Sequence, residues 1–486
     1  MNPSRREFLQ ASAALAAAAA TNKFATGEAQ TPKQPNLVFF MGEGQRADAM
    51  SISGHPLLKT PNHDRIGREG VMFRNAFCTN ALCAPARTVA MTGMYSRSTG
   101  MLSNEGLNKP LPSDLPFFTD MLRAAGYKIA IVGKVHAPIG FEDKHWDYYF
   151  GHNNPSNTYA NPVFKEGRDG VVGAATKYHG IYADDLSTDR AIQWLESLAG
   201  DQPFCLLCWF VAPHEPFFRP RRYADLYAGA TITKPSTFDD DLKGWPGKPQ
   251  CFVDAENKIG TTDSHPACAS LEGIAKDYYA GVVACDDNIG KVFSFLERKK
   301  ILDDTAILHT SDHGYFLGEW RQFDKRCMHE PSIRVPMLIR YPSRVPAGSV
   351  RDEMVLDLDI APTILDLAGI PAPKEMQGKS MLPLAHKADS AFRKEWFYEY
   401  FEWPNPEAVR PHRGIRTERY KLIHYVITPP AYEMYDLQAD PHEARNLYGS
   451  AEHDTIQSHL LERLDVLQKA LPTHVPQLQV TGSSGI

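Results

Sequence analysis

Cysteine is scarce in this sequence, with 8 residues among 486. A chain so poor in cysteine is not a small fold stapled by disulfide bonds. Long apolar runs are also missing after the N-terminus, so no segment there has the length of a transmembrane helix. The formal net charge of -6 argues against nucleic acid as a partner. What remains is an ordinary globular composition, 43% hydrophobic and 23% charged, typical of a soluble enzyme.

The N-terminus has the features of an export signal. The run Ser4-Arg5-Arg6-Glu7-Phe8-Leu9 resembles the twin-arginine motif, and an alanine-rich stretch follows it. We assign residues 1–30 to a signal peptide for the twin-arginine export machinery and exclude them from the fold argument. The mature protein is then expected in the periplasm or outside the cell. An exposed tail is the alternative, and cleavage after Ala20 and cleavage near Ala29 both stay open.

Two pairs of cysteines suggest chemistry by their spacing. Cys205 and Cys208 form a C-x-x-C, which occurs in metal and redox sites. They lie in the apolar run 204–211, which predicts a buried strand, and residues three apart in a strand point to opposite faces. We therefore assign both to the core. Cys251 and Cys268 flank a polar loop, and whether they form a disulfide stays open.

Short apolar runs alternate with helical patterns over most of the chain. Residues 117–125 are expected as a helix, and 184–198 and 276–299 as longer helices with apolar spacing near 3.6. This alternation predicts an α/β fold with a large, mainly parallel sheet flanked by helices. We assign it to a catalytic domain at residues 34–385. The runs expected as buried strands are 36–41, 128–132, 204–211, 305–310 and 335–340.

The pattern changes after about residue 385, where shorter strand-like segments follow one another. We assign residues 386–486 to a smaller C-terminal α+β domain. Residues 212–270, rich in Pro, Gly, Lys and Asp, are expected to form a long surface excursion at the rim of the site. The antiparallel strands expected in the C-terminal domain are 396–401, 414–417, 420–425 and 431–435, followed by a helix at 454–470.

Polar residues follow the predicted strands at their carboxyl ends. Ligands of open parallel sheets bind at that edge, so side chains that follow different strands are expected to meet there. Each also has a simpler interpretation, as a solvated turn residue, a helix cap, a surface lysine or a core histidine. The residues are Glu43 after the first strand, Lys134 and His136 after the second, His214 after the third, and Asp312 and His313 after the fourth.

A separate signal surrounds Cys83. In the run Cys83-Ala84-Pro85-Ala86-Arg87, Pro85 suits the first turn of a helix, and Gly93 suits its end. Cys83 then stands at a helix N-terminus, where unpaired N–H groups favour an anion. Arg87 follows one turn later on the same face. This arrangement predicts an anion site built around a sulfur. The alternative is a buried, inert cysteine beside a structural arginine.

The same run resembles the sulfatase signature, Cys-x-Pro-x-Arg followed by Thr-Gly, here Thr92-Gly93. The resemblance covers roughly residues 34–450 and implies a formylglycine-dependent sulfatase of the alkaline-phosphatase-like superfamily, of the exported bacterial type. Other parts of the family's pattern occur in the right order: Pro35-Asn36-Leu37-Val38-Phe39-Phe40-Met41, Thr60-Pro61-Asn62, Gly133-Lys134-Val135-His136, Ala212-Pro213-His214, Ser311-Asp312-His313-Gly314, Arg334-Val335-Pro336, Gly414-Ile415-Arg416-Thr417 and Tyr435-Asp436-Leu437.

The resemblance implies a role for each of these residues. Cys83 would be oxidised to formylglycine by a formylglycine-generating enzyme, and Arg87 would hold the resulting nucleophile. A divalent cation, usually calcium, would polarise the sulfate as a Lewis acid. Its ligands would be Glu43, Asp312 and His313. Sulfate oxygens would be bound by Lys134 and Lys325, the formylglycine hydroxyl would be assisted by His136, and the leaving alcohol would be protonated by His214.

One departure from the family's pattern concerns the metal. The family usually places two adjacent aspartates after the first strand, where this chain has Glu43 and Gly44. Gly44 supplies no side chain, and calcium prefers about six to eight oxygen ligands. We therefore expect weaker calcium retention, or a different ion such as magnesium or manganese. Gly44→Asp should tighten binding, unless the glycine is needed for a backbone angle that aspartate does not tolerate.

The expected substrate is a sulfated sugar or glycan, with a small aryl sulfate as the alternative. Residues 398–401 and 410–414 resemble a region of sulfatases that act on sulfated sugars, including those that remove the 6-sulfate of N-acetylglucosamine. His412 and Arg413 are assigned to substrate binding, with packing between domains as the other interpretation. Two further functions stay open: a phosphomonoester or phosphonate hydrolase, and a non-catalytic protein that binds sulfated glycans.

Cys83 should carry the formylglycine modification, because the signature is intact through Arg87 and Thr92-Gly93. Peptide mass spectrometry on protein from a host with the maturation enzyme should detect the aldehyde at this position. Cys83→Ala should abolish turnover and leave the fold intact. An unmodified thiol in active protein from the native host would refute the formylglycine mechanism.

Overall fold

The structure is a computed structural model that describes residues 34–473, apart from 139, 143, 145, 154–158, 240–247, 257, 261–269, 390 and 406. The signal segment 1–30 lies outside the described residues. So does Cys268, and its pairing with the buried Cys251 therefore stays a prediction. From Pro35 onward the described chain forms one compact unit. No helix among the described residues is long and apolar enough to cross a membrane.

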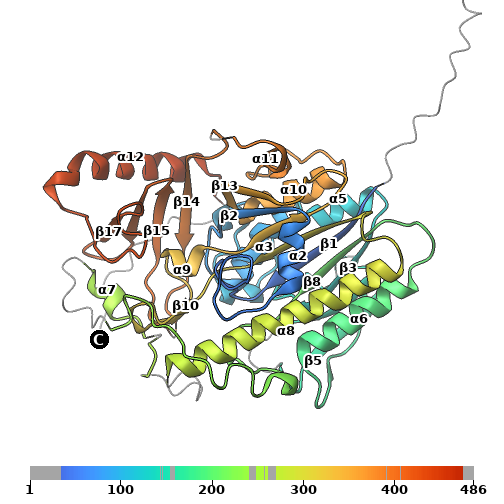
Figure 1. The fold of residues 1–486 in the computed structure, drawn as a ribbon. Coiled ribbons are helices and arrows are strands. Elements are labelled where there is room, and N and C mark those ends of the chain that lie inside the picture. Colours follow the sequence, from blue (N-terminus) through green and yellow to red (C-terminus); the bar gives the residue numbers. More distant parts are fainter. Residues whose placement is uncertain are drawn as a thin grey trace, which may run out of the picture. The chain divides into compact units, whose positions relative to one another are not determined.

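Parallel strands form the centre of a large sheet (Figure 1). Their spatial order is β9 (Thr305–Ser311), β1 (Asn36–Gly42), β8 (Phe204–Trp209) and β3 (Lys128–Lys134). Their apolar runs predict all four, and every residue of β8 and β9 is buried, as in sheets covered on both faces. Because neighbouring strands run in the same direction, their carboxyl ends lie at one edge of the sheet.

Further strands extend this sheet on both sides. Beside β9, the predicted strand β12 (Met337–Arg340) is antiparallel to β9 and to β2 (Val71–Phe77), and β13 (Ser349–Leu356) is parallel to β2. Beside β3, β4 (Tyr148–His152) is parallel and pairs with antiparallel β5 (Val163–Arg168). The mainly parallel sheet is therefore confirmed. The sequence analysis missed β2, β4, β5 and β13, three of which mix buried with more exposed positions instead of forming apolar runs.

Helices cover both faces of the sheet, as the sequence predicts, and each face has its own apolar core. Cys205 belongs to one core and Cys208 to the other. The assignment of the C-x-x-C to a buried strand is thus confirmed. On one face lie α6 (Ala183–Ser197) and α8 (Leu271–Arg298), side by side in Figure 1, and on the other α3 (Cys83–Thr92), α5 (Phe118–Ala124) and α10 (Ile360–Leu367).

The C-terminal part forms a second, antiparallel sheet with one long helix, as the sequence predicts. Leu460 and Leu464 of the helix pack against one face of this sheet. The opposite face shares a core with the catalytic part, where Tyr398 and Tyr435 pack with Phe77. The domain limits at residues 34, 385 and 486 stay predictions. The elements are β14 (Glu395–Tyr400), β15 (His412–Thr417), β16 (Tyr420–Tyr425), β17 (Ala431–Asp436) and α12 (Asp454–Ala470).

Short elements make up most of the remaining regular structure. The described part of residues 212–270 contains little regular structure, as expected of a surface excursion, and its one α-helix is short. Further short elements are α2 (Pro61–Arg68), α4 (Ser96–Thr99), α7 (Gln250–Val253), α9 (Glu330–Ile333), α11 (Leu382–His386), β6 (Val171–Val172), β7 (Thr176–Lys177), β10 (Phe316–Leu317) and β11 (Phe323–Asp324).

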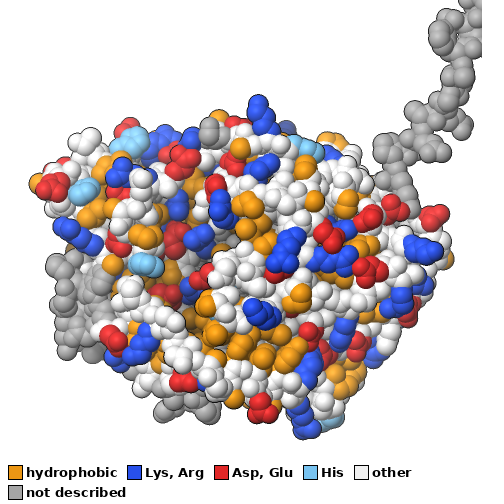
Figure 2. Space-filling model, in the orientation of Figure 1, with side chains coloured by type: hydrophobic (Ala, Val, Ile, Leu, Met, Phe, Trp, Pro, Cys, Tyr) orange, Lys and Arg blue, Asp and Glu red, His pale blue; other side chains and the backbone are white. Residues whose placement is uncertain are grey.

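Charged side chains of both signs are mixed on the face of the molecule shown in Figure 2. Lysine and arginine are interspersed there with aspartate and glutamate, so this face has no broad field of one sign.

Gly133 should be indispensable where β3 approaches β8. Its φ is +98°, and an added Cβ would lie 1.8 Å from the carbonyl oxygen of Trp209. Gly133→Ala should lower the free energy of unfolding by about 2–5 kcal/mol, from left-handed strain plus displaced backbone. In the control Gly126→Ala, φ is +92° but nothing lies within 4 Å, so the loss should be about 1–2 kcal/mol. Equal losses in urea titrations would contradict the crowding argument.

Candidate active site

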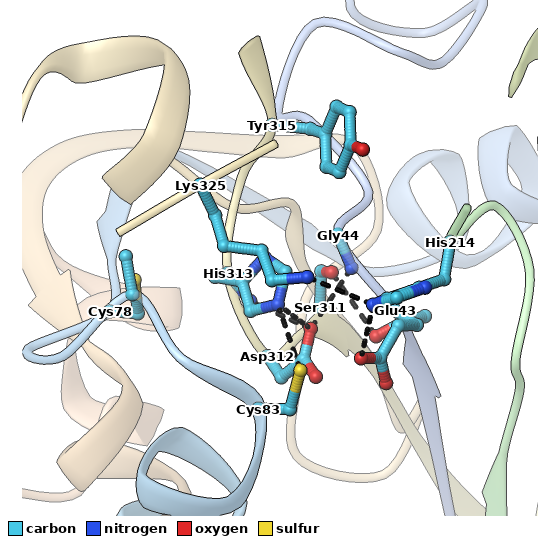
Figure 3. A network of polar contacts seen from close by, with 12 residues as sticks. Glu43, Gly44, Cys78, Cys83, His214, Ser311, Asp312, His313, Tyr315 and Lys325 are labelled. Carbon is cyan, nitrogen blue, oxygen red and sulfur yellow. Dashed lines mark hydrogen bonds and ion pairs between the residues drawn. The ribbon is translucent and has the colours of Figure 1, made fainter. Parts of the chain in front are cut away.

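The carboxyl edge of the sheet gathers the polar residues that the sequence predicts there. Glu43 follows β1, Lys134 ends β3, and Asp312 with His313 follows β9. Glu43, Cys83, Asp312 and His313 each offer one possible ligand atom, and these atoms all lie within 4.8 Å of one another (Figure 3). All four residues are buried. The predicted convergence of separate strands on one site is thus present in the structure.

Arg87 connects these strand ends from α3. Its Nε donates to Asp312 Oδ2 at 3.2 Å, its Nη1 to the Lys134 carbonyl at 2.6 Å, and its Nη2 to the Glu43 carboxylate. Lys134 Nζ forms a second ion pair with Glu43. Burial alone would raise the pKa of Glu43, but Lys134 and Arg87 hold it well below its usual range. The fully buried carboxylate is therefore ionised.

Cys83 begins α3 and is 1% exposed. Its Sγ lies 3.6 Å from His313 Nε2. Burial and the Glu43 carboxylate favour the thiol, yet Lys134, Lys325 and a hydrogen bond with His214 lower its pKa to about 6. By contrast, burial raises the pKa of the thiols of Cys78 and Cys285 well above their ordinary value. This difference supports an anion site at Cys83 over an inert buried cysteine.

Asp312 and His313 are fixed by the backbone around them. Asp312 Oδ1 accepts hydrogen bonds from the N–H groups of Gly44 at 3.0 Å and His313 at 2.9 Å. His313 Nδ1 lies 2.7 Å from the carbonyl of Gly314, which leaves Nε2 facing Cys83. Burial opposes a charge on His313, but Asp312 and Cys83 raise its pKa. Two carboxylates and an imidazole form a donor set that fits a divalent cation.

His214 and Lys325 form a pair on the other side of Glu43. Lys325 Nζ lies 2.9 Å from His214 Nε2, as Figure 3 shows. His214 Nδ1 lies 2.6 Å from the carbonyl of Glu215, and Nε2 is 3.6 Å from Glu43 Oε1. Burial would lower the pKa of Lys325, but Asp324 and Glu215 raise it well above its usual range. The pair therefore joins a charged ammonium to an imidazole beside the cluster.

His136 lies just beyond β3, with a φ of 46° and 5% exposure. Burial, and next the charge of Lys134, lower its pKa well below the ordinary range, so the ring is neutral. Among the described residues its Nδ1 has no hydrogen-bond partner. The unpaired Nδ1 of this neutral ring is available for a hydrogen bond with a ligand of the site.

The structure does not bring the predicted pair His412 and Arg413 together at the site. The two are neighbours on β15, so their side chains point to opposite faces of the C-terminal sheet. His412 is completely buried and stacks on Tyr398. Arg413 Nη1 instead donates to Gln468 Oε1 of α12 at 2.5 Å. These contacts favour the packing interpretation, and substrate binding by His412 and Arg413 stays a prediction.

Comparison with known proteins decides the family. Residues 35–370 match the family described as "Sulfatase". The chain belongs to the sulfatase family. It is thus a sulfuric ester hydrolase, as the sequence motifs imply, with the fold expected of an alkaline-phosphatase-like enzyme. The C-terminal region of this sulfatase, residues 318–470, matches "N-sulphoglucosamine sulphohydrolase, C-terminal". Residues 2–21 match a twin-arginine signal sequence, and the prediction of a periplasmic or secreted protein is confirmed.

Individual relatives cover nearly the whole of this sulfatase. An N-acetylglucosamine-6-O-sulfatase of Bacteroides thetaiotaomicron is 32% identical over 99% of this chain and 93% of its own. A solved structure described as a complex with its substrate D-glucosamine-2-N,6-O-disulfate has 31% identity and a TM-score of 0.81, and the match covers 90% of this chain and 98% of that one. A phosphonate monoester hydrolase of Agrobacterium radiobacter shares the fold at 21% identity, with a TM-score of 0.72 over 90% of this chain and 96% of its own.

Three residues around the site escaped the sequence analysis. Glu215 Oε1 lies 3.2 Å from His214 Nε2, and Tyr315 donates from its hydroxyl to Glu215 Oε2 at 2.9 Å. Asp324 Oδ1 lies 2.9 Å from Lys325 Nζ. Glu215 follows His214 in the sequence, and Asp324 precedes Lys325. An acidic residue next to a predicted site histidine or lysine was therefore the signal that could have identified both. Tyr315 offered no such signal.

Gly44 occupies a conformation and a space that an aspartate could enter only with strain. Its φ is +71°, and an added Cβ would lie 3.0 Å from Tyr315 Cδ2 and 3.2 Å from His313 Cε1. Its backbone is fixed as well, because its carbonyl accepts from the Tyr278 hydroxyl at 2.7 Å and its N–H donates to Asp312. The exception stated for Gly44→Asp, a glycine needed for its backbone angle, is therefore the case that the structure favours.

Gly44→Asp should reduce metal retention in this sulfatase and not increase it, because the new Cβ displaces His313. The measurement is metal content after dialysis, followed by activity on adding back calcium, magnesium or manganese. Gly54→Asp is the control, since Gly54 has a φ of +86° but nothing within 4 Å, and it should retain metal like the parent. Equal or greater retention in Gly44→Asp would contradict the crowding argument.

Proposed function

We propose that this sulfatase removes the 6-sulfate from glucosamine units of sulfated sugars or glycans. The observation that carries the reaction is the arrangement of Cys83, whose thiol has a pKa lowered to about 6, against the buried Glu43, Asp312 and His313. The substrate rests on the relative that acts as an N-acetylglucosamine-6-O-sulfatase and on the related structure with a glucosamine disulfate. No other part of the proposal depends on the identity of the sugar.

Cys83 would enter the reaction as formylglycine, made by a formylglycine-generating enzyme, and its hydrate would supply the oxygen that attacks sulfur. Arg87 holds the start of α3 to both carboxylates and fixes this oxygen in place. Lys134, which pairs with Glu43, would bind a sulfate oxygen, as would Lys325. The neutral His136 would accept a proton from the formylglycine hydroxyl, which assists release of sulfate.

His214 would protonate the leaving alcohol. Its Nδ1 is held by the Glu215 carbonyl, so Nε2 is the atom that faces the substrate side together with Lys325. Lys325, charged and 2.9 Å away, would keep its proton and supply a counter-charge for the sulfate. Sugar alcohols are poor leaving groups, and general acid catalysis is worth most for these.

Glu43, Asp312 and His313 would hold the divalent cation, with the oxygen at Cys83 as a further ligand. When bound, the cation would neutralise the sulfate and polarise it as a Lewis acid. The Glu43 carboxylate is kept ionised by Lys134 and Arg87, which is the state a cation requires. Gly44 offers no side-chain ligand, so we propose calcium held weakly, or magnesium or manganese in its place.

His214→Ala should slow release of sulfate from glucosamine 6-sulfate by about a hundredfold or more. The loss with an activated aryl sulfate should be much smaller, because its leaving group needs little protonation. Sulfate release by the metal-loaded, formylglycine-containing enzyme is the measurement. His424→Ala, which removes a half-buried histidine that stacks on Tyr432, is the control and should affect both substrates little.

Other results would lead to other functions. Equal losses on both substrates would remove His214 from the leaving-group role. Cleavage of a phosphonate monoester in preference to every sulfate ester would favour the phosphonate hydrolase function. Binding of the sulfated sugar without turnover, in protein whose Cys83 is converted, would favour the non-catalytic binding protein.

A further inference from the structure

The segment that carries Lys325 has an unusual backbone. Asp324 and Arg326, on either side of Lys325, have φ values of 80° and 84°. Non-glycine residues seldom adopt such angles, which persist only where the surroundings over-determine them. All three residues are buried. Two residues with strained backbone conformations thus flank the buried Lys325.

Asp324 contacts both of its cationic neighbours. Its Oδ1 lies 2.9 Å from Lys325 Nζ, and its Oδ2 forms an ion pair with Arg326 Nη1. Lys325 Nζ in turn lies 2.9 Å from His214 Nε2. A lysine ammonium on a flexible stem has many orientations available, and the Asp324 carboxylate selects the one that faces His214. Arg326 also keeps Asp324 ionised, since the pKa of this buried carboxyl falls well below its usual range.

Arg326 continues the contacts into the C-terminal part. Its Nη2 lies 2.9 Å from Glu407 Oε2 and 3.7 Å from Glu402 Oε1. Glu402 Oε2 accepts the N–H of Asn104 at 2.7 Å. Asn104 Oδ1 then accepts the N–H of Ala84 at 3.2 Å, next to Cys83 in α3. One chain of polar contacts therefore runs from His214 through Asp324, Arg326 and Glu402 to the helix that bears Cys83, and Glu407 is a second partner of Arg326.

Hydrogen bonds of the backbone also connect the Lys325 segment to the residues before Cys83. The Arg326 N–H donates to the carbonyl of Ala81 at 3.2 Å. The Tyr398 hydroxyl of β14 donates to the Arg326 carbonyl at 2.6 Å and accepts from the Ala81 N–H at 3.1 Å. Ala81 lies two residues before Cys83. The C-terminal sheet thus fixes the segment that carries Lys325 against the turn that leads to Cys83.

We infer that Asp324 is a positioning residue that holds the Lys325 ammonium against His214 and, through Arg326, makes the geometry of this pair depend on Glu402 and Glu407 of the C-terminal part. Asp324 acts through Lys325. The inference rests on the proposed leaving-group role of His214 and Lys325. It adds that residues outside the large sheet orient the Lys325 ammonium, since Glu402 and Glu407 belong to the C-terminal part.

Asp324→Asn tests the inference, because it keeps the size and removes the charge that orients Lys325. The turnover number with glucosamine 6-sulfate should fall on the order of tenfold or more, while KM changes little. With an activated aryl sulfate the fall should be several times smaller. The control is Asp359→Asn, which removes the charge of a fully buried carboxylate that pairs with Arg393. It should cost stability without changing the ratio of the two rates.

Glu407→Gln extends the test to a residue that is easier to replace, with a side chain 23% exposed. It should change the same ratio in the same direction by a smaller factor, and it decides the matter if Asp324→Asn does not fold. A ratio unchanged in the folded variants, while His214→Ala does change it, would overturn the inference and leave the proposed function standing. A ratio unchanged in His214→Ala as well would overturn both.

Discussion

The site depends on holding two carboxylates in the interior of the protein. Burying an isolated charge costs several kcal/mol, and only close opposite charges with good hydrogen bonds offset that cost. Glu43 and Asp312 have those partners because Arg87 comes from α3 and Lys134 from β3. Since the partners arise on separate elements, the sheet and its first covering helix have to be assembled before the carboxylates are stabilised. The charge balance of the site therefore depends on the packing of α3 against the sheet.

The sequence predicts those parts of the fold and the site in which local pattern and spatial position agree. Continuous apolar runs predict β1, β3, β8 and β9, and the polar residue that follows each such run lies at the shared edge. Strands with mixed burial, such as β2 and β13, give no such pattern, since their burial comes from distant partners. The Cys83 signature likewise predicts its helix, because Pro85 and Gly93 mark its two ends.

What the sequence did not predict depends on three-dimensional crowding and on strand register. His412 and Arg413 look equivalent in a list of polar residues, but adjacent positions of a strand face opposite ways, and only the structure shows what each face packs against. In the sequence, Gly44 is only a position without a ligand side chain. The structure adds its positive φ and the proximity of Tyr315. Asp324 carries no motif of its own. Its importance comes from the ion pairs that the folded backbone lets it form with both Lys325 and Arg326.

The nearly complete burial of Cys83 also places a limit on when this residue can be modified. With 1% of the surface of Cys83 exposed at the start of α3, its sulfur is out of reach of the active site of another protein. An enzyme that oxidises Cys83 has to act on a chain in which this segment is still open. Oxidation then competes in time with folding, and every molecule that folds first keeps its thiol. Under the proposed formylglycine mechanism, the fraction of active protein in a preparation would thereby be set during synthesis.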